Sequence, residues 1–245
     1  MKNKVNHPDT EKRNPSEVKA MFGRVAKHYD LINRAMCGGL DVRWRKKLAK
    51  EVLTSEANGN EFLDVACGSG DVCAEILNQC PNAKVIGVDF CPEMLKIAQA
   101  KCKTTTFIEA DCANLPFAEN TFSGATISFG FRNFKDRARC LTEIARVLKP
   151  NAPLCILEVA RANGLFEFLQ KIFMTKIVPC VASLFGGTRA DYEYLAKTTM
   201  EYPCESKIKE MFNNAGFDEI KTIKFVFGMV AITKGINKKF NTKAE

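Results

Sequence analysis

Short apolar runs alternate with amphipathic stretches along the middle of the chain. The apolar runs have the length of strands that are covered on both faces, and they occupy residues 62–66, 85–89, 105–110, 122–128 and 153–159. The stretches between them have helical periodicity: one extends from Asp71 to about Cys80, one begins at Pro92, and one begins at Asp136 and ends before Pro150. Repeated strand–helix units of this kind require a mostly parallel sheet with helices on both faces, so the sequence predicts a doubly wound α/β fold.

The two ends of the chain have a different pattern. Residues 15–58 form two amphipathic helical stretches separated by Gly38-Gly39, and residues 163–203 contain two more, after the fifth strand. A helix over 204–215 then precedes two apolar runs, 220–227 and 229–233, which a tight turn at Gly228 joins into an antiparallel hairpin. We therefore expect a seven-stranded sheet in one domain over 15–235, in which 15–58 and 163–203 are helical lids, 60–160 is the cofactor-binding core and 204–235 is the C-terminal helix and hairpin. The Lys-rich segments 1–14 and 236–245 read as flexible tails.

Composition excludes several classes of protein. The chain has 245 residues, of which 46% are hydrophobic and 26% are charged, which is ordinary for a globular protein and unlike a disordered or fibrous one. The eleven cysteines include no pair separated by only two residues, so zinc-ribbon and thioredoxin spacings are absent; with only two histidines, no metal site is expected. The sequence contains neither a signal-peptide pattern nor an apolar run long enough to span a membrane, which predicts a cytoplasmic protein in a reducing compartment.

A glycine loop follows the first predicted strand and contains the candidate cofactor-binding residues. Asp64 lies in the strand, and Gly68-Ser69-Gly70 leads into the next helix. Asp89 ends the second strand 19 residues after Gly70 (89 − 70), where a carboxylate can accept the hydroxyl groups of a ribose. Position 73, where dinucleotide-binding loops have a third small residue, is Cys, and a carboxylate at position 64 would repel a pyrophosphate. A cationic nucleoside ligand fits this loop better than a nicotinamide dinucleotide does, and a purely structural turn is the remaining alternative.

The same segments resemble S-adenosylmethionine-dependent methyltransferases of the Rossmann-like class. Within that class, the sequence is similar to the ubiquinone/menaquinone biosynthesis C-methyltransferases, in matching motifs that extend from about residue 18 to 235. These motifs are VAKHYDLIN (25–33), LDVACGSGD (63–71), ISFGFRN (127–133), RVLKP (146–150), YEYL (192–195), AGF (215–217) and GMVA (228–231). The segment containing Phe129, Arg132 and Asn133 is the most specific of them, because methyltransferases in general lack it.

The resemblance implies S-adenosylmethionine as the methyl donor, in a mostly parallel sheet with an antiparallel C-terminal hairpin. Residue by residue, the family's cofactor contacts fall on Ser69, Asp89, Asp111, Cys112 and Ser128, in addition to Asp64, Gly68 and Gly70 of the loop. The sequence departs from the family pattern at Asn151-Ala152, Val159-Ala160, Cys67 and Ser69, and none of these departures removes a carboxylate.

Methylation of a ring carbon of a hydroquinone needs help with ionisation, because a phenol of pKa about 10 is mostly protonated at neutral pH. Arg132, after the fourth strand, is the first candidate to stabilise the phenolate, with pairing to an acid as the alternative. Asn133 could hold the second ring oxygen or cap the next helix. His28 is the available imidazole base, although a lone helix histidine is more often structural, and Tyr194 could line the quinol site or pack below a lid.

The expected substrate is a polyprenyl hydroquinone, and no binding of nucleic acid is expected. The apolar segment 165–185 either packs a lid helix or provides a wall for the polyprenyl tail. Lys and Arg outnumber Asp and Glu by 36 to 28, a net charge of +8. This charge suits a loose peripheral association with an anionic membrane surface at its inner face, although surface lysines also serve solubility alone. The sequence does not indicate the oligomeric state.

Three functional alternatives remain open at this stage. Within the family, the substrate is demethylmenaquinol or the 2-polyprenyl-6-methoxy-benzoquinol precursor of ubiquinone, and we favour demethylmenaquinol. A nucleic-acid methyltransferase would match the positive charge, but the Asn/Asp-Pro-Pro-aromatic segment typical of that class is missing where Ser128-Phe129-Gly130 stands. A cofactor-binding scaffold without catalysis is an alternative of a different class, and it predicts binding without turnover.

Overall fold

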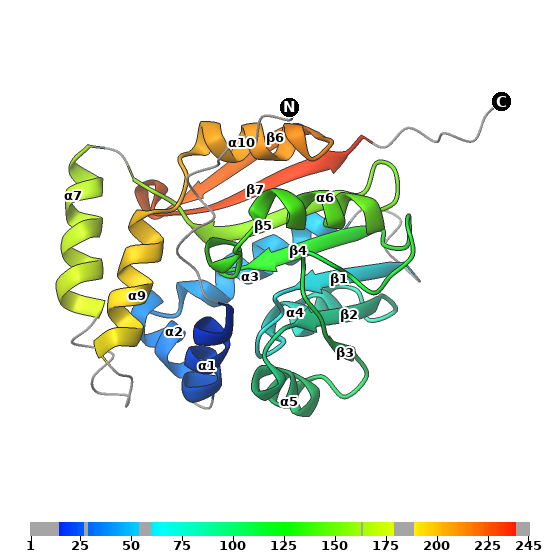
Figure 1. Cartoon of the computed structure of the whole chain (residues 1–245), viewed down its shortest axis with the longest axis horizontal. Helices are drawn as coiled ribbons and strands as arrows, with labels where there is room; N and C mark the ends of the chain where they lie inside the picture. Colours follow the sequence, from blue (N-terminus) through cyan, green and yellow to red (C-terminus); the bar gives the residue numbers. More distant parts are fainter. Residues whose placement is uncertain (1–14, 27–28, 54–59, 163, 179–188, 239–245) are drawn as a thin grey trace, which may run out of the picture.

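The computed structural model describes residues 15–26, 29–53, 60–162, 164–178 and 189–238. The candidate base His28 lies outside the described residues. The described elements form a central sheet with helices on both faces and a further group of helices at one edge (Figure 1).

The sheet has seven strands within the described residues, in the order β3-β2-β1-β4-β5-β7-β6. Neighbouring strands from β3 to β5 are parallel, whereas β7 is antiparallel to both β5 and β6. The strands are β1 (Glu61–Val65), β2 (Lys84–Asp89), β3 (Thr106–Glu109), β4 (Gly124–Ser128), β5 (Pro153–Val159), β6 (Phe217–Phe225) and β7 (Val230–Asn237). The predicted mostly parallel sheet with an antiparallel C-terminal hairpin is therefore confirmed.

Helices occupy most of the remaining segments, and apart from α2 they lie where the periodicity predicts. They are α1 (Pro15–Val25), α2 (Tyr29–Cys37), α3 (Leu40–Val52), α4 (Asp71–Gln79), α5 (Pro92–Lys101), α6 (Arg137–Val147), α7 (Leu165–Ile172), α9 (Arg189–Met200) and α10 (Glu205–Asn214). The described residues also contain the short helical turns η2 (Phe131–Asn133) and η4 (Val226–Gly228) and the π-helix η3 (Phe173–Ile177). Asp136 caps α6 by accepting the N–H of Arg139, as a residue of its type at that position should.

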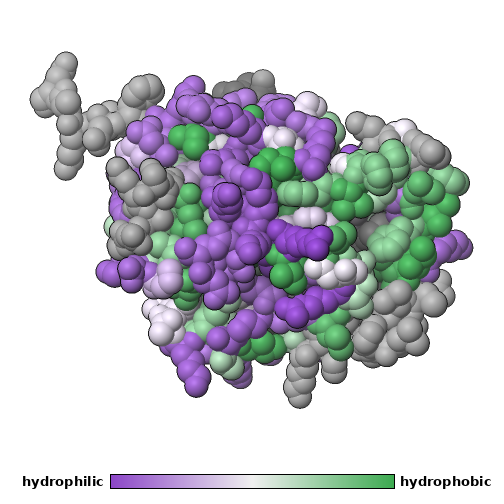
Figure 2. Space-filling view, turned by 180° about the vertical axis from the view of Figure 1, so that it is seen from behind, coloured by the Kyte–Doolittle hydropathy of each residue, from purple (hydrophilic) through white to green (hydrophobic). Residues whose placement is uncertain are grey.

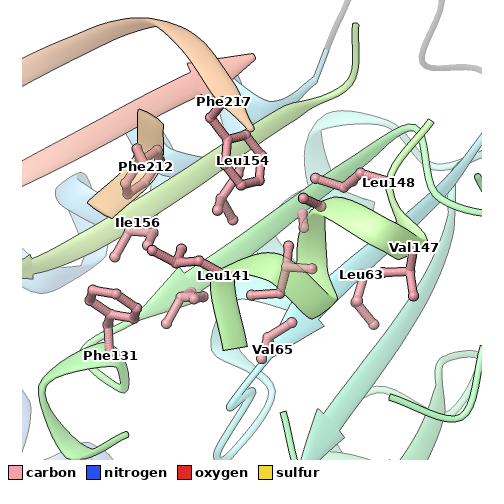
Figure 3. Close-up of a cluster of buried hydrophobic side chains, with 14 of the residues drawn as sticks. Leu63, Val65, Phe131, Leu141, Val147, Leu148, Leu154, Ile156, Phe212 and Phe217 are labelled. Atoms are coloured by element: carbon pink, nitrogen blue, oxygen red, sulfur yellow. The ribbon is translucent and has the colours of Figure 1, made fainter. Parts of the chain in front are cut away.

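Two hydrophobic clusters cover the two faces of the sheet, because successive strand residues point to opposite sides. On β1, Leu63 and Val65 join the cluster that contains α6 and α10, whereas Phe62 joins the cluster that contains α3 and α4. Leu154 of β5 belongs to the first cluster and Cys155 to the second. Figure 3 shows the first cluster, in which side chains from α6 and α10 meet the strands. Both faces are covered, which explains why these strands read as continuous apolar runs.

The carboxyl ends of β1, β2 and β4 meet at one edge of the sheet. Val65 pairs with Val88 of β2 on one side and with Ile127 of β4 on the other, so the loops that follow these strands leave the sheet side by side. In Figure 1 the parallel strands β1 and β4 point toward the side where α1, α2 and α9 lie. The predicted candidate residues are therefore gathered where open α/β sheets bind their ligands.

The structure corrects several predicted boundaries. Strand β7 continues to Asn237, past the predicted domain end at 235, and the Asn237 side chain is fully buried, so 236 and 237 do not belong to a tail. Strand β6 begins at Phe217, directly after Gly216, rather than at 220, and is irregular between Asp218 and Lys221. A bulge of this kind interrupts the alternation on which the prediction depended. The N-terminal segment contains one more helix than predicted, α2.

Candidate functional site

A cavity of about 560 Å³ lies at the carboxyl edge of the parallel strands. Each of the four neighbouring strands β1 to β4 contributes to its wall through the loop at its end, and Val18 and Phe22 of α1 contribute from the N-terminal side. The predicted site residues on this wall are Gly68, Asp89, Asp111, Cys112, Ser128 and Asn133. Residues that are far apart in the sequence are thus brought together by the strand register.

Asp89 is held rigidly in the wall of the cavity. Its Oδ1 accepts the N–H of Cys91 and its Oδ2 accepts the N–H of Gly68, each at 2.9 Å. Burial raises the pKa of Asp89 to about 6, although these backbone hydrogen bonds act in the opposite direction. Each carboxylate oxygen retains capacity to accept a further hydrogen bond, so the group can accept hydroxyl groups of a ligand.

Two other polar side chains of the wall are also suited to a ligand. Asp111 Oδ1 accepts the N–H of Ala113 at 2.9 Å, which orients the carboxylate after β3. The Ser128 hydroxyl is buried and has no hydrogen-bond partner among the described residues, although it belongs to the cavity wall. A buried hydroxyl left in this way indicates a place where a ligand supplies the missing partner.

The three residues of the predicted glycine loop have different surroundings. Gly68 has a φ of +52° and lines the cavity, which fits close approach of the backbone to a ligand. Gly70 lies outside the wall: its φ is +79°, which favours glycine, and a Cβ there would be crowded at 3.1 Å from the Cβ of Ala98. Ser69 also lies outside the wall, because its hydroxyl is buried and donates to Asp30 Oδ1 at 2.5 Å. The structure thus gives Ser69 and Gly70 structural contacts where the sequence predicted cofactor contacts.

Asp64 lies below the glycine loop and not on the wall of the cavity. Its side chain is buried and accepts hydrogen bonds from the Thr126 hydroxyl at 2.7 Å and from the Cys73 thiol at 3.4 Å. Burial raises the pKa of Asp64 to about 7 against the effect of these two donors. Asp64 therefore joins β1, β4 and α4 below the loop, and direct contact between this carboxylate and a ligand is not what the geometry favours.

Arg132 is buried in an ion pair beside the cavity. Its Nη1 donates to Glu158 Oε1 at 2.5 Å and to the carbonyl oxygen of Phe129 at 2.8 Å, and its backbone N–H donates to Glu158 Oε2 at 3.1 Å. Arg132 is only 7% exposed and is not on the wall, whereas Gly130 and Asn133 on either side of it are. The guanidinium is thus paired with an acid, as the alternative interpretation expected, although this acid is buried on β5 and not at the surface. The predicted effect of Arg132 on a phenolate stays a prediction.

Asn133 is the catalytic candidate that the structure places on the cavity wall. Its Oδ1 accepts the hydroxyl of Tyr194 at 3.2 Å, which connects the turn η2 to α9 of the helical insertion. The third candidate, His28, is outside the described residues, and its predicted role stays a prediction.

A charged network around the glycine loop was missed by the sequence reasoning. Lys101 of α5 donates to Asp30 of α2 at 2.8 Å and also to Asp71 at the start of α4. Arg45 of α3 binds Asp71 at 3.1 Å and Asp41 at 2.5 Å. Burial alone would raise the pKa of Asp30, but the hydrogen bonds from Lys101 and Ser69 outweigh it and lower that pKa. A charged residue on the apolar face of a helix, as Arg45 is beside Trp44 and Leu48, is the sequence signal that points to such pairs.

These residues fit an adenosyl ligand with a positive charge. Asp89 and Asp111 provide acceptors for hydroxyl and amino groups, Ser128 provides an unpartnered hydroxyl, and Phe90 and Met94 provide apolar wall for a flat ring. Within the described residues, no group of three or more His, Cys, Asp or Glu is placed to hold a metal ion. Also within that part of the chain, no helix has the length and apolar character needed to cross a membrane.

Comparison with known proteins shows what this chain is related to. A model of the ubiE/COQ5 methyltransferase family matches residues 9–237. A demethylmenaquinone methyltransferase of Thermus thermophilus is 36% identical over 220 residues, which cover 88% of this chain and 99% of the relative. A ubiquinone/menaquinone biosynthesis C-methyltransferase of Geobacter sp. is 35% identical over 226 residues, covering 89% and 95%.

Solved structures share the fold at lower sequence identity. A Thermotoga maritima S-adenosylmethionine-dependent methyltransferase, a possible histamine N-methyltransferase, matches with a TM-score of 0.63 at 17% identity, covering 89% of this chain and 99% of the neighbour. The [4+2]-cyclase SpnF matches with a TM-score of 0.65 at 17% identity, covering 93% and 97%, so the fold alone does not determine the reaction. The family match and the relatives aligned over most of their length identify the family, which the shared fold alone does not. They confirm the resemblance seen in the sequence. The chain belongs to the ubiE/COQ5 methyltransferase family.

Proposed function

We propose that this methyltransferase transfers a methyl group from S-adenosylmethionine to a ring carbon of demethylmenaquinol. The observation that carries the proposal is the acid-lined cavity at the ends of β1 to β4, in a chain whose near full-length relatives include demethylmenaquinone methyltransferases. S-adenosylmethionine supplies an electrophilic methyl group when it is bound. Asp89, Asp111, Cys112 and Ser128 are the residues proposed to hold it, with the backbone of Gly68.

The chain's own contribution is to bind the quinol, exclude water and help a phenol to ionise. Neutralising charge during the transfer is favoured in a dry site, which gives the helices at the cavity a role as a lid. The contacts of Val18 and Phe22 with the cavity, and of Asp30 with Ser69, support this role for the helices of 15–58. The bond from Tyr194 to Asn133 supports a similar role for the insertion 163–203.

Arg132 and Asn133 are proposed to act on the ring oxygens. Asn133 is on the wall and its amide can donate to a ring oxygen. Arg132 is fixed next to it by Glu158, so its charge favours an ionised phenol while the paired carboxylate reduces the size of this effect. Ionisation of a phenol at neutral pH, about 3 pKa units below its ordinary pKa, costs roughly 4 kcal/mol. Because Glu158 compensates part of the charge of Arg132, we propose that a base also takes part. His28 remains the proposed base.

Substitution of Arg132 tests the role proposed for this loop. Arg132→Lys retains the charge and the backbone N–H bond to Glu158, but it loses the contacts of the guanidinium Nη1 with Glu158 Oε1 and with the carbonyl oxygen of Phe129. We expect turnover to fall by at least about tenfold while the affinity for S-adenosylmethionine changes little. Arg43→Lys is the matched control, because Arg43 is exposed on α3 and is not on the wall of the cavity. Equal turnover of Arg132→Lys and the wild type would remove Arg132 from the mechanism.

The ubiquinone precursor is the alternative substrate within the family. It is favoured by the relatives that carry the double name ubiquinone/menaquinone biosynthesis C-methyltransferase. The test is a methyl-transfer assay with the purified full chain and isotope-labelled S-adenosylmethionine, in which demethylmenaquinol, the benzoquinol precursor and RNA compete. We expect label in menaquinol. Label in the benzoquinol alone would select the alternative, and cofactor binding with no labelled product would support the scaffold interpretation.

We further propose that the protein works at the inner face of the cytoplasmic membrane. The polyprenyl tail of the substrate stays in the bilayer, since each CH₂ group buried in apolar surroundings is worth about 0.8 kcal/mol. The net charge of +8 supports attraction to anionic lipid.

A further inference from the structure

Six exposed apolar side chains lie on two neighbouring elements far from each other in the sequence. Four are on α7 and η3 and two are on the β6–β7 turn: Phe168 (60% exposed), Leu169 (45%), Ile172 (39%), Ile177 (47%), Val226 (39%) and Phe227 (73%). We call this set the apolar edge. The rings of Phe166 and Phe227 are stacked with centroids 4.4 Å apart, so the two elements are in direct contact. Figure 2 shows green side chains gathered on the side of the molecule where α7 lies.

The members of the apolar edge that belong to α7 are exposed on its outer face, and the inner face of this helix binds the rest of the protein. Gln170 is buried, donates to the carbonyl oxygen of Ala160 at 2.8 Å and accepts the N–H of Ala162 at 3.1 Å. These two hydrogen bonds of Gln170 fix the rotation of α7 about its axis, so that the opposite, apolar face of the helix is exposed to solvent. Single exposed apolar residues are ordinary, but a contiguous set usually marks an interaction surface.

Positive charge accompanies the apolar edge. Lys171 and Lys176 are exposed on the same helical segment, and neither forms an ion pair with another described residue. The acid of this segment, Glu167, is already bound to Arg161 at 2.5 Å. An apolar strip with free cations beside it complements a surface that is apolar inside and anionic outside, as a phospholipid membrane is. Two copies of the chain related by a twofold axis would instead bring their lysines together.

We propose that the apolar edge inserts into the headgroup region of an anionic phospholipid membrane. The choice of a membrane as partner rests on the proposed function, in which the quinol is drawn from the bilayer. A second cavity of about 640 Å³ supports this orientation, because Phe166 and Phe227 line it next to the apolar edge and Glu158, the partner of Arg132, lines it as well. Docking through the apolar edge would place the membrane beside this second cavity, whose wall includes the residue that binds Arg132.

Vesicle sedimentation of the full chain tests the proposal. The wild type is expected to bind mixed phosphatidylcholine–phosphatidylglycerol vesicles more strongly than pure phosphatidylcholine vesicles, and added salt is expected to weaken the binding. The double variant Phe168→Glu/Ile172→Glu is expected to lose at least about tenfold in affinity, because it removes two inserting side chains and adds negative charge. Val42→Glu is the matched control, since Val42 is 44% exposed on α3 and outside the apolar edge.

Two further changes keep the test independent of misfolding. Phe227→Asn removes the most exposed ring at a φ of +54°, a conformation that asparagine adopts more readily than phenylalanine, so the fold is retained and binding should fall. Lys171→Gln/Lys176→Gln should lower binding to the mixed vesicles only. Its control is Lys84→Gln/Lys103→Gln, at exposed lysines outside the apolar edge.

Three results would overturn the proposal. These are unchanged binding of the apolar-edge variants, equal binding of the wild type to neutral and anionic vesicles, and sedimentation of a dimer that Phe168→Glu/Ile172→Glu dissociates without vesicle binding. Activity on a quinol with a truncated, water-soluble tail separates this proposal from the proposed function. Vesicle binding without that activity rejects the reaction and keeps the docking surface, whereas activity without vesicle binding does the reverse.

Discussion

The carboxylate of Asp89 is ionised at a cost, because the residue is only 6% exposed. Backbone N–H groups, those of Gly68 and Cys91 among them, offset only part of this cost. A ligand that donates hydroxyl groups and carries positive charge stabilises the ionised form. The carboxyl group carries a proton below its pKa of about 6 and loses it above. Cofactor affinity should therefore rise with pH across this value.

We predict that the affinity for S-adenosylmethionine increases between about pH 5 and about pH 8, and that Asp89→Asn removes most of this dependence. The same variant should weaken binding at pH 8 on the order of 10- to 100-fold, since a hydrogen bond to a charged group contributes about 1.5–3 kcal/mol. Isothermal titration calorimetry across the pH range measures both effects. Asp218→Asn, at a surface pair with Lys238, is the control.

A steep pH dependence that survives in Asp89→Asn would contradict this role of Asp89. Asp64, whose pKa is raised to about 7 by burial, is the next group to consider in that case, because its ionisation has the same sign.

For single residues, the sequence predicted where the site residues lie better than it predicted which residues their side chains bind. Asp89, Asp111 and Ser128 follow the carboxyl ends of parallel strands, and this alone brings them to one edge. What Ser69 and Arg132 bind is decided elsewhere: Ser69 donates to a residue 39 positions earlier, and Arg132 to one 26 positions later. Such pairings depend on how helices and neighbouring strands pack, which hydrophobic periodicity does not specify.

At the scale of elements, the end of β7 is tied to the end of α6. Asn237 Nδ2 donates to the carbonyl oxygens of Ala145 at 3.0 Å and Leu148 at 2.9 Å, in the last turn of that helix and just after it. Its backbone N–H donates to Ala152 and its carbonyl oxygen accepts from Asn151. Asn237 thus satisfies helix-end carbonyls that are otherwise buried without a donor.

We predict that Asn237→Ala lowers the free energy of unfolding by about 2–3 kcal/mol, because buried carbonyl oxygens lose their donor. Chains truncated after Lys238 should unfold like the wild type, whereas truncation after Gly235 should be at least as damaging as the substitution. Urea denaturation measures all three. Equal free energies of unfolding for the two truncated chains would mean that residues 236–237 do not stabilise the fold.

The sequence placed the last strand correctly but ended it too early. Residues 234–237 are Lys, Gly, Ile and Asn, and this segment contains a single apolar residue where the other strands have an apolar run. The hydrogen bonds to β5 hold this end in the sheet, and only the structure shows them.

Lys101 of α5 connects two other helices, because its ammonium group contacts both Asp30 of α2 and Asp71 of α4. We predict that Lys101→Met speeds amide hydrogen exchange in α2, because Asp30 and Asp71 then repel one another without a cation between them. The free energy of unfolding should change by no more than about 1 kcal/mol, since Lys101 and Asp30 are about a third exposed.

Hydrogen-exchange mass spectrometry checks this prediction, with Lys207→Met as the control because Lys207 forms a comparable pair with Glu210 outside the network. Unchanged exchange in α2 would mean that helix packing alone holds α2 in place.

At the scale of the whole molecule, one edge of the sheet combines the acid-lined cavity, the loop after β4 that contains the proposed catalytic residues, and the helices of both predicted lids. Figure 1 shows these helices on one side of the sheet. The doubly wound fold was predictable because strand and helix periods alternate regularly between residues 60 and 160. The fold alone is shared with proteins of other reactions, so the assignment of the reaction depends on the family and on the wall residues of the cavity.

Isoprenoid quinones extracted from cells that lack this protein give the most direct measurement of the central claim. Mass spectrometry should then find menaquinone replaced by a precursor that is lighter by one CH₂ group, and the gene for the wild-type chain, but not for Arg132→Lys, should restore menaquinone. An unchanged quinone profile in the deleted cells would contradict the proposed reaction.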